Sequence, residues 1–392
     1  MRQEGHLISY DVTLTVQAPL FIGSGEKVGK TEYIYLPKDS KVLMLDLKKL
    51  ANFLTRKRLL QNYEMFLMDS LVKSYKKNIA TFFYDNNVKP QEYREFTAYS
   101  IDGAGETIQK ENLREVYLFT KDGQGLPYIP GSSLKGAFRT AILTYLLVND
   151  EELNANDEAE RKNLYMKWMS EIQESNGKPH IVKKNLARET KNLETNFLHK
   201  KRLQDDKTAL TDMVNSAMRG ISVSDSTPIN LCQLMLAQKV DYSVAGKPQQ
   251  LPIFRECLRP NTTCQFTVTV DQRMAAQTGM TMEFLLNAIT LHQQWQQKYF
   301  YAHFKGHEQQ DVDAKALVLW LGGGVGFANK TIVHPALGSV NALAFDSELL
   351  GRLFPSGNHD KDIDIGISPH MQKLAGYQGE LYRMGQCMLE VQ

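Results

Sequence analysis

The segment from Ile129 to Arg139, which reads IPGSSLKGAFR, holds the residue types that most clearly allow binding chemistry. Its Pro and Gly set up a turn, and Ser132 or Ser133 can cap the following helix by accepting a backbone hydrogen bond. The free N–H groups and the positive end of the helix dipole then favour an anion. Lys135 and Arg139 stand four residues apart and share one helix face. The segment therefore predicts a phosphate-binding helix start; the alternative is a capped core helix with two surface cations.

A glycine-rich loop is the second candidate, in the run LGGGVGFANKT from Leu321 to Thr331. A Walker loop needs Gly directly before Lys-Thr, but Asn329 stands there. A dinucleotide loop needs its third Gly at the same place and a strand before it, whereas we expect a helix over 312–321. We therefore expect no ATP, no NAD and no other cofactor. The loop either lies against a phosphate chain or forms a helix C-cap and a turn; its candidate residues are Gly322, Gly323, Gly324, Gly326 and Lys330.

Histidines and carboxylates elsewhere favour structural roles over catalysis. His303 and His307 are four residues apart, but Gly306 weakens the helix there and no HExxH pattern accompanies them, so we expect no metal site. Asp225 has no carboxylate partner at a defined spacing, and we interpret it as a turn residue before Pro228. The sequence thus predicts no catalytic residue.

Composition limits the class of protein. The 392 residues include 46 Lys+Arg and 44 Asp+Glu, a net charge of only +2, which argues against a uniformly basic polymer but allows a local nucleic-acid groove. None of the four cysteines forms a CxxC pair, which indicates free thiols in a reducing cytoplasm. We see no signal-peptide core and no stretch of 18 apolar residues, so we expect a cytoplasmic protein that does not contact membranes.

Periodicity predicts an α+β protein. In the first half we expect strands at 11–16, 32–36, 116–119 and 221–226, a tight turn at Gly23-Ser24-Gly25, and helices within 47–83, 131–147 and 161–218. In the second half we expect strands at 233–243, 251–258, 264–271 and 382–391, and helices at 281–301 and 312–321. Each half reads as the split β-α-β order of ferredoxin-like domains. The sequence therefore predicts two tandem ferredoxin-like (RRM-like) domains with helical insertions, residues 1–228 and residues 229–392.

Four of these segments together resemble the RAMP superfamily of CRISPR effector complexes. The opening strand followed by PLFIGSG at 19–25 resembles the start of these proteins, and 129–139 resembles their IPGSSLKGxxR motif. Val223–Ser226 and the loop 322–326 follow in the expected order. Within the superfamily, the length and the helical insertions are most similar to the subunit of the type III-A (Csm) complex that caps the crRNA 3′ end.

The resemblance implies a non-catalytic RNA-binding subunit that assists crRNA maturation in antiviral defence. It implies contacts with crRNA, transiently with target RNA, with the neighbouring RAMP backbone subunit and other Csm-complex subunits, and with host nucleases. The residues it assigns to RNA or neighbour contacts are Gly23, Ser24, Gly25, Ser132, Ser133, Lys135, Arg139, Gly322, Gly323, Gly324, Gly326 and Lys330.

Two alternatives stay open. A RAMP endoribonuclease that processes precursor crRNA would use a His general base beside a Lys or Tyr, for which His6 with Tyr10 or His303 with Lys305 are the candidates. The 5′-end-binding RAMP subunit of the same complex is the other. Incubating the protein with repeat RNA distinguishes the first, and its neighbours in a pull-down distinguish the second.

Overall fold

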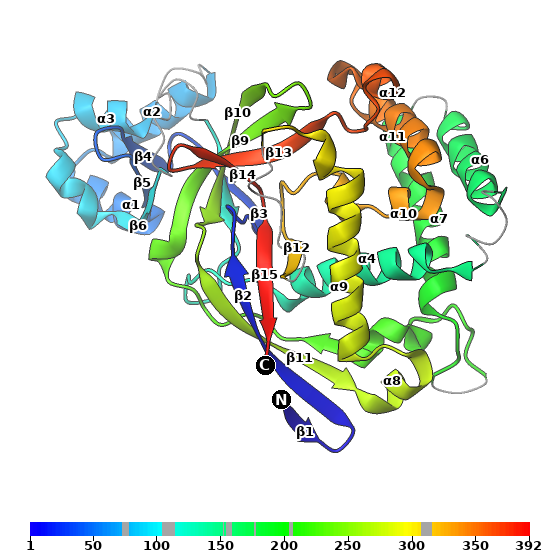
Figure 1. Cartoon of the computed structure of the whole chain (residues 1–392). Coiled ribbons are helices and arrows are strands. Elements are labelled where there is room, and N and C mark those ends of the chain that lie inside the picture. The colour runs from blue at the N-terminus through cyan, green and yellow to red at the C-terminus, as the bar shows by residue number, and fades with distance from the viewer. Residues whose placement is uncertain are drawn as a thin grey trace.

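A computed structural model describes residues 1–72, 78–103, 114–151, 153, 159–175, 178–203, 207–306 and 316–392 (Figure 1). The strands are β1 (Arg2–Glu4), β2 (Leu7–Val16), β3 (Gly23–Val28), β4 (Tyr33–Leu36), β5 (Lys41–Leu45), β6 (Thr97–Asp102), β7 (Val116–Phe119), β8 (Ile221–Val223), β9 (Leu234–Ser243), β10 (Pro248–Leu258), β11 (Thr263–Asp271), β12 (Leu317–Trp320), β13 (Met371–Tyr377), β14 (Glu380–Arg383) and β15 (Gln386–Val391). The helices are α1 (Leu47–Lys57), α2 (Leu60–Val72), α3 (Ile79–Asp85), α4 (Gly131–Val148), α6 (Ala159–Gln173), α7 (Pro179–Leu198), α8 (Gln272–Thr278), α9 (Met282–Tyr299), α10 (Val333–Leu337), α11 (Ser339–Leu353) and α12 (Asp362–Ile365).

The first sheet is antiparallel and runs in the order β12-β15-β2-β11-β8, with β1 paired to β2. Its central strand alternates as the sequence predicted, with Val12, Leu14 and Val16 fully buried between more exposed polar residues. These side chains join the main core together with residues of α4 and α9, which pack on each other. The period-two pattern therefore fixes which face of this sheet is covered by helices.

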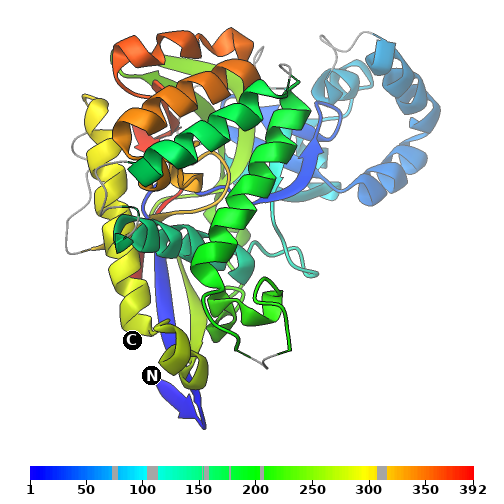
Figure 2. The same cartoon turned by 90° about the vertical axis from the view of Figure 1, so that its right-hand side faces the viewer.

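The second sheet is larger and mixed, in the order β3-β7-β10-β9-β6-β5-β4, with the hairpin β13-β14 attached to β9. The β10-β7 and β6-β9 pairs are parallel. Beside the β4-β5-β6 end, α1, α2 and α3 form a separate lobe with its own aromatic core, which includes Phe53, Phe82, Phe83 and Phe96 (Figure 1). Helices α6, α7 and α11 lie on the opposite side of the molecule (Figure 2).

A buried ion pair connects three strands of the second sheet, β10, β7 and β6. The Glu256 carboxylate on β10 is fully buried and accepts hydrogen bonds from Lys121 Nζ at 2.6 Å, Tyr99 Oη at 2.5 Å and the Phe119 backbone N–H at 2.9 Å. These donors satisfy the charge that burial would otherwise penalise. The ion pair therefore fixes β6 and the end of β7 against β10.

Most predicted elements are confirmed. The strands at 11–16, 32–36, 116–119, 233–243, 251–258 and 264–271, and the helices at 131–147 and 281–301, match observed elements within a few residues. The helical stretch 47–83 corresponds to α1, α2 and α3, the last of which extends to Asp85; Arg58, the C-cap residue of α1, has a left-handed backbone. The strand at 221–226 is shorter, Ile221–Val223, and the C-terminal strand is divided into β14 and β15.

Two local predictions are wrong. Gly23-Ser24-Gly25 does not form a tight turn but begins β3, which pairs with β7; Gly25, with φ of +89°, lies where the register of the two strands shifts. The described part of 312–321 is the strand β12, not a helix. Its four-residue apolar run pairs with β15, and a short buried run of this kind has no periodicity that separates strand from helix.

Both sheets take strands from either side of residue 228. The first combines β2 and β8 with β11, β12 and β15, and the second combines β3 to β7 with β9, β10 and β13. The fold is therefore a mixed α/β arrangement around two sheets that the two halves of the chain build together. The division into 1–228 and 229–392 stays a sequence prediction. Among the described helices, none has both the length and the apolar character that crossing a membrane requires.

Candidate nucleic-acid interface

The start of α4 is held by a carboxylate from a distant part of the chain. Pro130 is the N-cap residue and supplies no side-chain hydrogen bond, whereas the Gly131 N–H donates to Asp225 Oδ1 at 2.8 Å. A Cβ at Gly131 would lie 2.4 Å from the carbonyl oxygens of Val223 and Ser224, so only glycine allows this approach. The predicted cap by Ser132 or Ser133 is therefore wrong.

The 129–131 and 224–226 segments form one structural unit. Ile129 and Ser226 exchange two hydrogen bonds, from the Ile129 N–H to Ser226 Oγ at 2.9 Å and from the Ser226 N–H to the Ile129 carbonyl at 3.0 Å. Asp225 thus does more than form a turn, because its carboxylate occupies the helix end where the sequence predicted a phosphate. The side chains of α4 that face away from this carboxylate are therefore the next place to look for an anion contact.

Those side chains line a cavity of about 340 Å³ between α4 and α7. Lys135 is half-buried, and burial lowers its pKa. Within the described part of the chain Lys135 has no ion-pair partner, whereas Arg139 pairs with Glu194 of α7. The lining holds four cations and one acid, which gives the cavity a positive charge: Lys135, Arg139, Lys191, Arg219 and Glu194. We call this the α4 cavity; Ser132 lines it, and the half-buried Ser133 does not.

The glycine loop packs against the segment before β3. The Gly323 N–H donates to the Phe21 carbonyl at 2.7 Å, and a Cβ at Gly322 (φ +76°) would lie 2.1 Å from that same oxygen. A Cβ at Gly324 would meet Arg255 Nη1 at 2.7 Å, and one at Gly326 would meet the Lys373 side chain at 3.5 Å. The glycines therefore permit close packing beside two cations. A strand does precede the loop, but it is antiparallel to its neighbour β15, so the sheet pairing as well as the glycine spacing argues against a dinucleotide site.

A cluster of partly buried cations lies on the face of the second sheet that carries Arg255, beside this loop. Lys239 of β9 and Lys373 of β13 both pair with Asp241, at 3.1 and 2.9 Å. The Arg255 guanidinium lies 5.3 Å from the centre of the Phe21 ring, a cation–π distance. Burial lowers the pKa of Arg255, and it lowers that of Lys330 with a further contribution from Arg255. We call Lys239, Arg255, Lys330 and Lys373 the basic face; only Asp241 offsets these four charges among the neighbours described.

Strand register extends this surface to the sheet edge. Arg255 is directly opposite Tyr117 of β7, which is directly opposite Lys27 of the edge strand β3. Directly opposite residues share one face of a sheet, so an exposed aromatic ring lies in the same row as the cations. Cations that interleave with aromatic rings on an open sheet are typical of single-stranded nucleic-acid binding, because phosphates pair with the former and bases stack on the latter.

The predicted site residues fall into connected regions. Gly23, Ser24 and Gly25 are exposed on the edge strand β3, and the glycine loop and Lys330 adjoin the basic face. A second cavity of about 180 Å³ is lined by Lys330, Arg139 and Glu194 and therefore lies between the basic face and the α4 cavity. Sequence reasoning missed Lys239, Arg255 and Lys373, which stand singly on three strands; the available signal was a cation inside each of two predicted strands.

The nuclease candidates are not brought together as a His–Lys or His–Tyr group. His6 Nε2 lies 3.6 Å from a carboxylate oxygen of Asp271. His303 Nδ1 is buried without a hydrogen-bond partner among the described residues, and the Lys305 carbonyl accepts from Tyr242. His307 lies outside the described residues. His6 therefore lies beside a carboxylate, and no hydrogen bond joins either candidate pair among the described residues.

Comparisons with known proteins agree with this geometry. The family model of the RAMP superfamily matches residues 13–330. The chain is 28% identical to the CRISPR system Cms protein Csm5 of Mycobacterium tuberculosis over 98% of both chains, and 32% identical to that of Streptococcus thermophilus over 67% of this chain and 64% of the relative. It also resembles one chain of a solved Csm-crRNA-target RNA ternary complex of a type III-A CRISPR-Cas system. The TM-score is 0.60 and the sequence identity is 21%, over 97% of this chain and 100% of that chain. The crystal structure of T. onnurineus Csm5 gives a TM-score of 0.59 and 18% sequence identity, over 96% of this chain and 99% of that chain.

Proposed function

Because the chain belongs to the RAMP superfamily, we propose that it is the RNA-binding subunit of a type III-A (Csm) CRISPR effector complex that caps the 3′ end of the crRNA. Its full-length similarity to proteins named Csm5 supports this assignment over the 5′-end-binding subunit and over an endoribonuclease. The observation that carries the proposal is the basic face, where four partly buried cations gather at one face of the second sheet beside Phe21, with Tyr117 in the same row.

The basic face holds the crRNA backbone. Lys239 and Lys373 are held in place by Asp241, and Arg255 is held by the Phe21 ring, so these donors are positioned before RNA arrives. Preorganised donors lose little side-chain entropy when they bind phosphate. The glycine loop borders this surface and allows an RNA chain to approach its backbone closely, as proposed for Gly322, Gly323, Gly324 and Gly326.

The α4 cavity and the edge strand β3 serve neighbour or RNA contacts. Lys135 offers an unpaired positive charge there among the described residues, and the second cavity connects it through Arg139 to Lys330. Strand β3 is the edge of the second sheet, and its residues Gly23, Ser24 and Gly25 are exposed. An exposed edge is a common docking position for another chain, and we assign it to the neighbouring RAMP backbone subunit.

The two sheets are the centres of two ferredoxin-like (RRM-like) units. The packing of helices α4 and α9 in the core beside the first sheet supports this finer description. Because each sheet takes strands from both sides of residue 228, the units interleave along the chain. Separate expression of residues 1–228 and 229–392 tests the boundary: independent domains would each fold alone.

In this proposal the chain does not cut RNA, and it acts in the cytoplasm. Target RNA is a transient partner, and host nucleases dock on the surface of the chain. The surroundings of His6 and His303 support the non-enzymatic assignment. Complexes assembled without the chain should carry crRNA with abnormal 3′ ends and normal 5′ ends. Purified chain that cleaves repeat RNA, with or without divalent metal, would favour the endoribonuclease instead.

A direct experiment is reconstitution of the complex with charge-reversed chains. Arg255→Glu with Lys373→Glu should reduce the crRNA retained per complex, because two cations of the basic face become repulsive. Lys135→Glu tests the α4 cavity separately. Lys162→Glu is the matched control, since this exposed lysine of α6 lies outside both regions. Unchanged crRNA content and 3′ ends in the Arg255 and Lys373 variant would refute the proposed RNA surface.

A further inference from the structure

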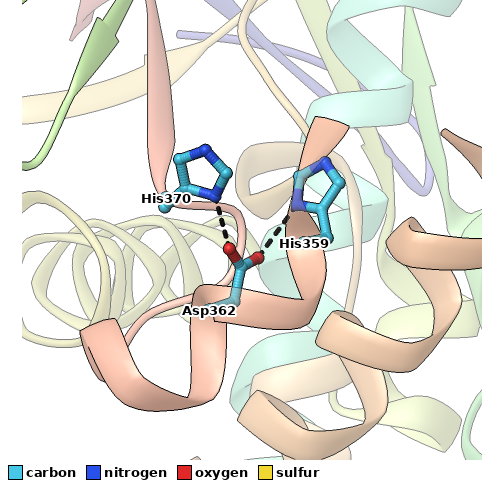
Figure 3. Close-up of side chains that lie close together, drawn as sticks. All are labelled: His359, Asp362 and His370. Carbon is cyan, nitrogen blue, oxygen red and sulfur yellow. Dashed lines mark hydrogen bonds and ion pairs between the residues drawn. The ribbon is translucent and has the colours of Figure 1, made fainter. Parts of the chain in front are cut away.

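Two histidine side chains in the last part of the chain meet around one buried carboxylate, that of Asp362 (Figure 3). Asp362 is the first residue of α12, His359 precedes it by one helical turn, and His370 directly precedes β13. His359 Nδ1 lies 2.9 Å from Asp362 Oδ2, and His370 Nδ1 contacts Asp362 Oδ1. The three ligand-type atoms all lie within 4.8 Å of one another. The cluster is therefore compact enough for its donors to share one ion.

The cluster is shielded from solvent. The Asp362 side chain has no exposed surface, and those of His359 and His370 are only 12% and 13% exposed. Ser368 Oγ donates to Asp362 Oδ2 at 2.6 Å, and Ser347 Oγ donates to the His359 carbonyl at 2.6 Å. These hydrogen bonds orient the carboxylate and one imidazole, as the groups surrounding metal ligands commonly do.

A second buried carboxyl group lies near Asp362 and has no hydrogen-bond donor among the described residues. Asp346 of α11 is 1% exposed, and neither of its carboxylate oxygens has a hydrogen-bond partner among the described residues. Burial raises its pKa well above the usual value, and the nearby Asp362 charge raises it further. His334 Nε2 lies 3.6 Å from Asp346, but burial lowers the pKa of His334 to about 4, so it is neutral at pH 7. Asp346 is therefore a buried carboxyl group, close to Asp362, whose oxygens have no hydrogen-bond donor among the described residues.

We propose that His359, Asp362 and His370 form a binding site for a divalent transition-metal ion, with Zn²⁺ as the preferred ion. Imidazole nitrogen and carboxylate oxygen are ordinary zinc ligands, at about 2.0–2.2 Å from the metal. Ligands at that distance in a tetrahedron are about 3.3 Å apart, so the 2.9 Å contact must widen by only a few tenths of an ångström. Mg²⁺ prefers six oxygens and is a poor fit to two imidazoles.

The metal would have a structural role. It would join the segment after α11 to the start of β13, three residues before Lys373 of the basic face. A bound cation would also offset the charge of the buried Asp362 carboxylate. The site thus fixes the strand that carries Lys373, independently of whether the chain binds RNA.

The test is zinc binding by the full-length chain after treatment with a chelator. We expect one Zn²⁺ per chain by elemental analysis after gel filtration, with a rise in melting temperature that Mg²⁺ does not produce. His359→Gln and His370→Gln keep an N–H donor for Asp362 but remove a ligand, so each should weaken zinc binding at least about tenfold while the fold is kept. Ser368→Ala should weaken zinc binding about 10–100-fold.

His180→Gln, an exposed histidine of α7, is the matched control and should bind zinc like the wild type. Circular dichroism of each variant without metal reports whether the fold is intact. A wild-type chain that retains no zinc would overturn the proposal. So would His359→Gln and His370→Gln variants that bind zinc with the same stoichiometry and affinity as His180→Gln.

Discussion

Neutralising the basic face should change how RNA binding depends on salt. The variant combines Lys239→Gln, Arg255→Gln and Lys373→Gln with Asp241→Asn. The last change is needed because Asp241, whose side chain is only 15% exposed, would otherwise lose both of its lysine partners and remain a buried unpaired charge. The reference is therefore the single variant Asp241→Asn, which differs from it by three positive charges alone.

The expected size follows from counterion release. Each phosphate contact on a single strand contributes about 0.7 to the slope of log K against log salt concentration, so three contacts contribute about 2.1. At roughly 0.15 M salt, loss of one phosphate contact lowers the binding constant by about 0.6 decade, so loss of all three weakens binding by about 50-fold. Loss of the Arg255–Phe21 contact adds a stability cost of about 0.5–2 kcal/mol, which melting curves measure separately.

Fluorescence anisotropy with a labelled single-stranded RNA, titrated at several KCl concentrations, measures both the salt slope and the binding constant. Lys162→Gln serves as the control for loss of an exposed cation and should keep the full slope. A folded triple-charge variant whose slope equals that of Asp241→Asn would refute the assignment of RNA phosphates to the basic face. A reduced slope after Lys162→Gln would show that the charge effect is not local.

Three further predictions concern single residues. Asp241→Asn alone should bind RNA several-fold more tightly than the wild type at low salt, because the carboxylate that competes with phosphate is removed; anisotropy measures this, and weaker binding would contradict it. Gly322→Ala should destabilise the fold by at least about 2 kcal/mol, because φ is +76° and its Cβ would meet the Phe21 carbonyl. Gly136→Ala, with open space around its Cβ, should instead stabilise α4 by up to about 1 kcal/mol. Denaturant titrations measure both changes, and equal effects of the two substitutions would contradict the packing argument. Burial lowers the pKa of His292 to about 4, so the unfolded chain takes up this proton first as the pH falls below about 6.5. Stability should therefore fall by up to about 3 kcal/mol between pH 6.5 and pH 4, and melting curves of His292→Gln should lack this part of the decline.

Much of the fold was predictable because its signals are local. The alternation in β2, the helical spacing after Pro130 and the turn residues around β10 and β11 each depend on residues a few positions apart. The short apolar strand β12 was not predictable in this way, since only its pairing with β15 distinguishes it from a helix. Strand β3 escaped prediction for a similar reason, because glycines that suggest a turn also permit a bulged strand.

The candidate site was only partly predictable. The IPGSSLKG segment and the glycine loop were found from their residue types, but the role of each glycine depends on what packs against it. Gly131 meets the backbone at 223–224, and Gly322 meets the Phe21 carbonyl. The basic face could not be found from spacing, because its four cations come from three strands and one loop.

The sequence by itself determined most of the strands and helices, apart from β3 and β12, and indicated two motifs as candidate anion sites, because periodicity and turn chemistry act over a few residues. Only the tertiary structure decided what those motifs contact. Asp225, 94 residues after Gly131, takes the helix end where a phosphate was expected. His359, Asp362 and His370 are close in sequence, but their side chains meet only because the turn between α11 and β13 directs both imidazoles at one carboxylate. The contact of Asp225 with Gly131 depends on distant segments that folding brings together, and the local pattern of side chains carries no information about it.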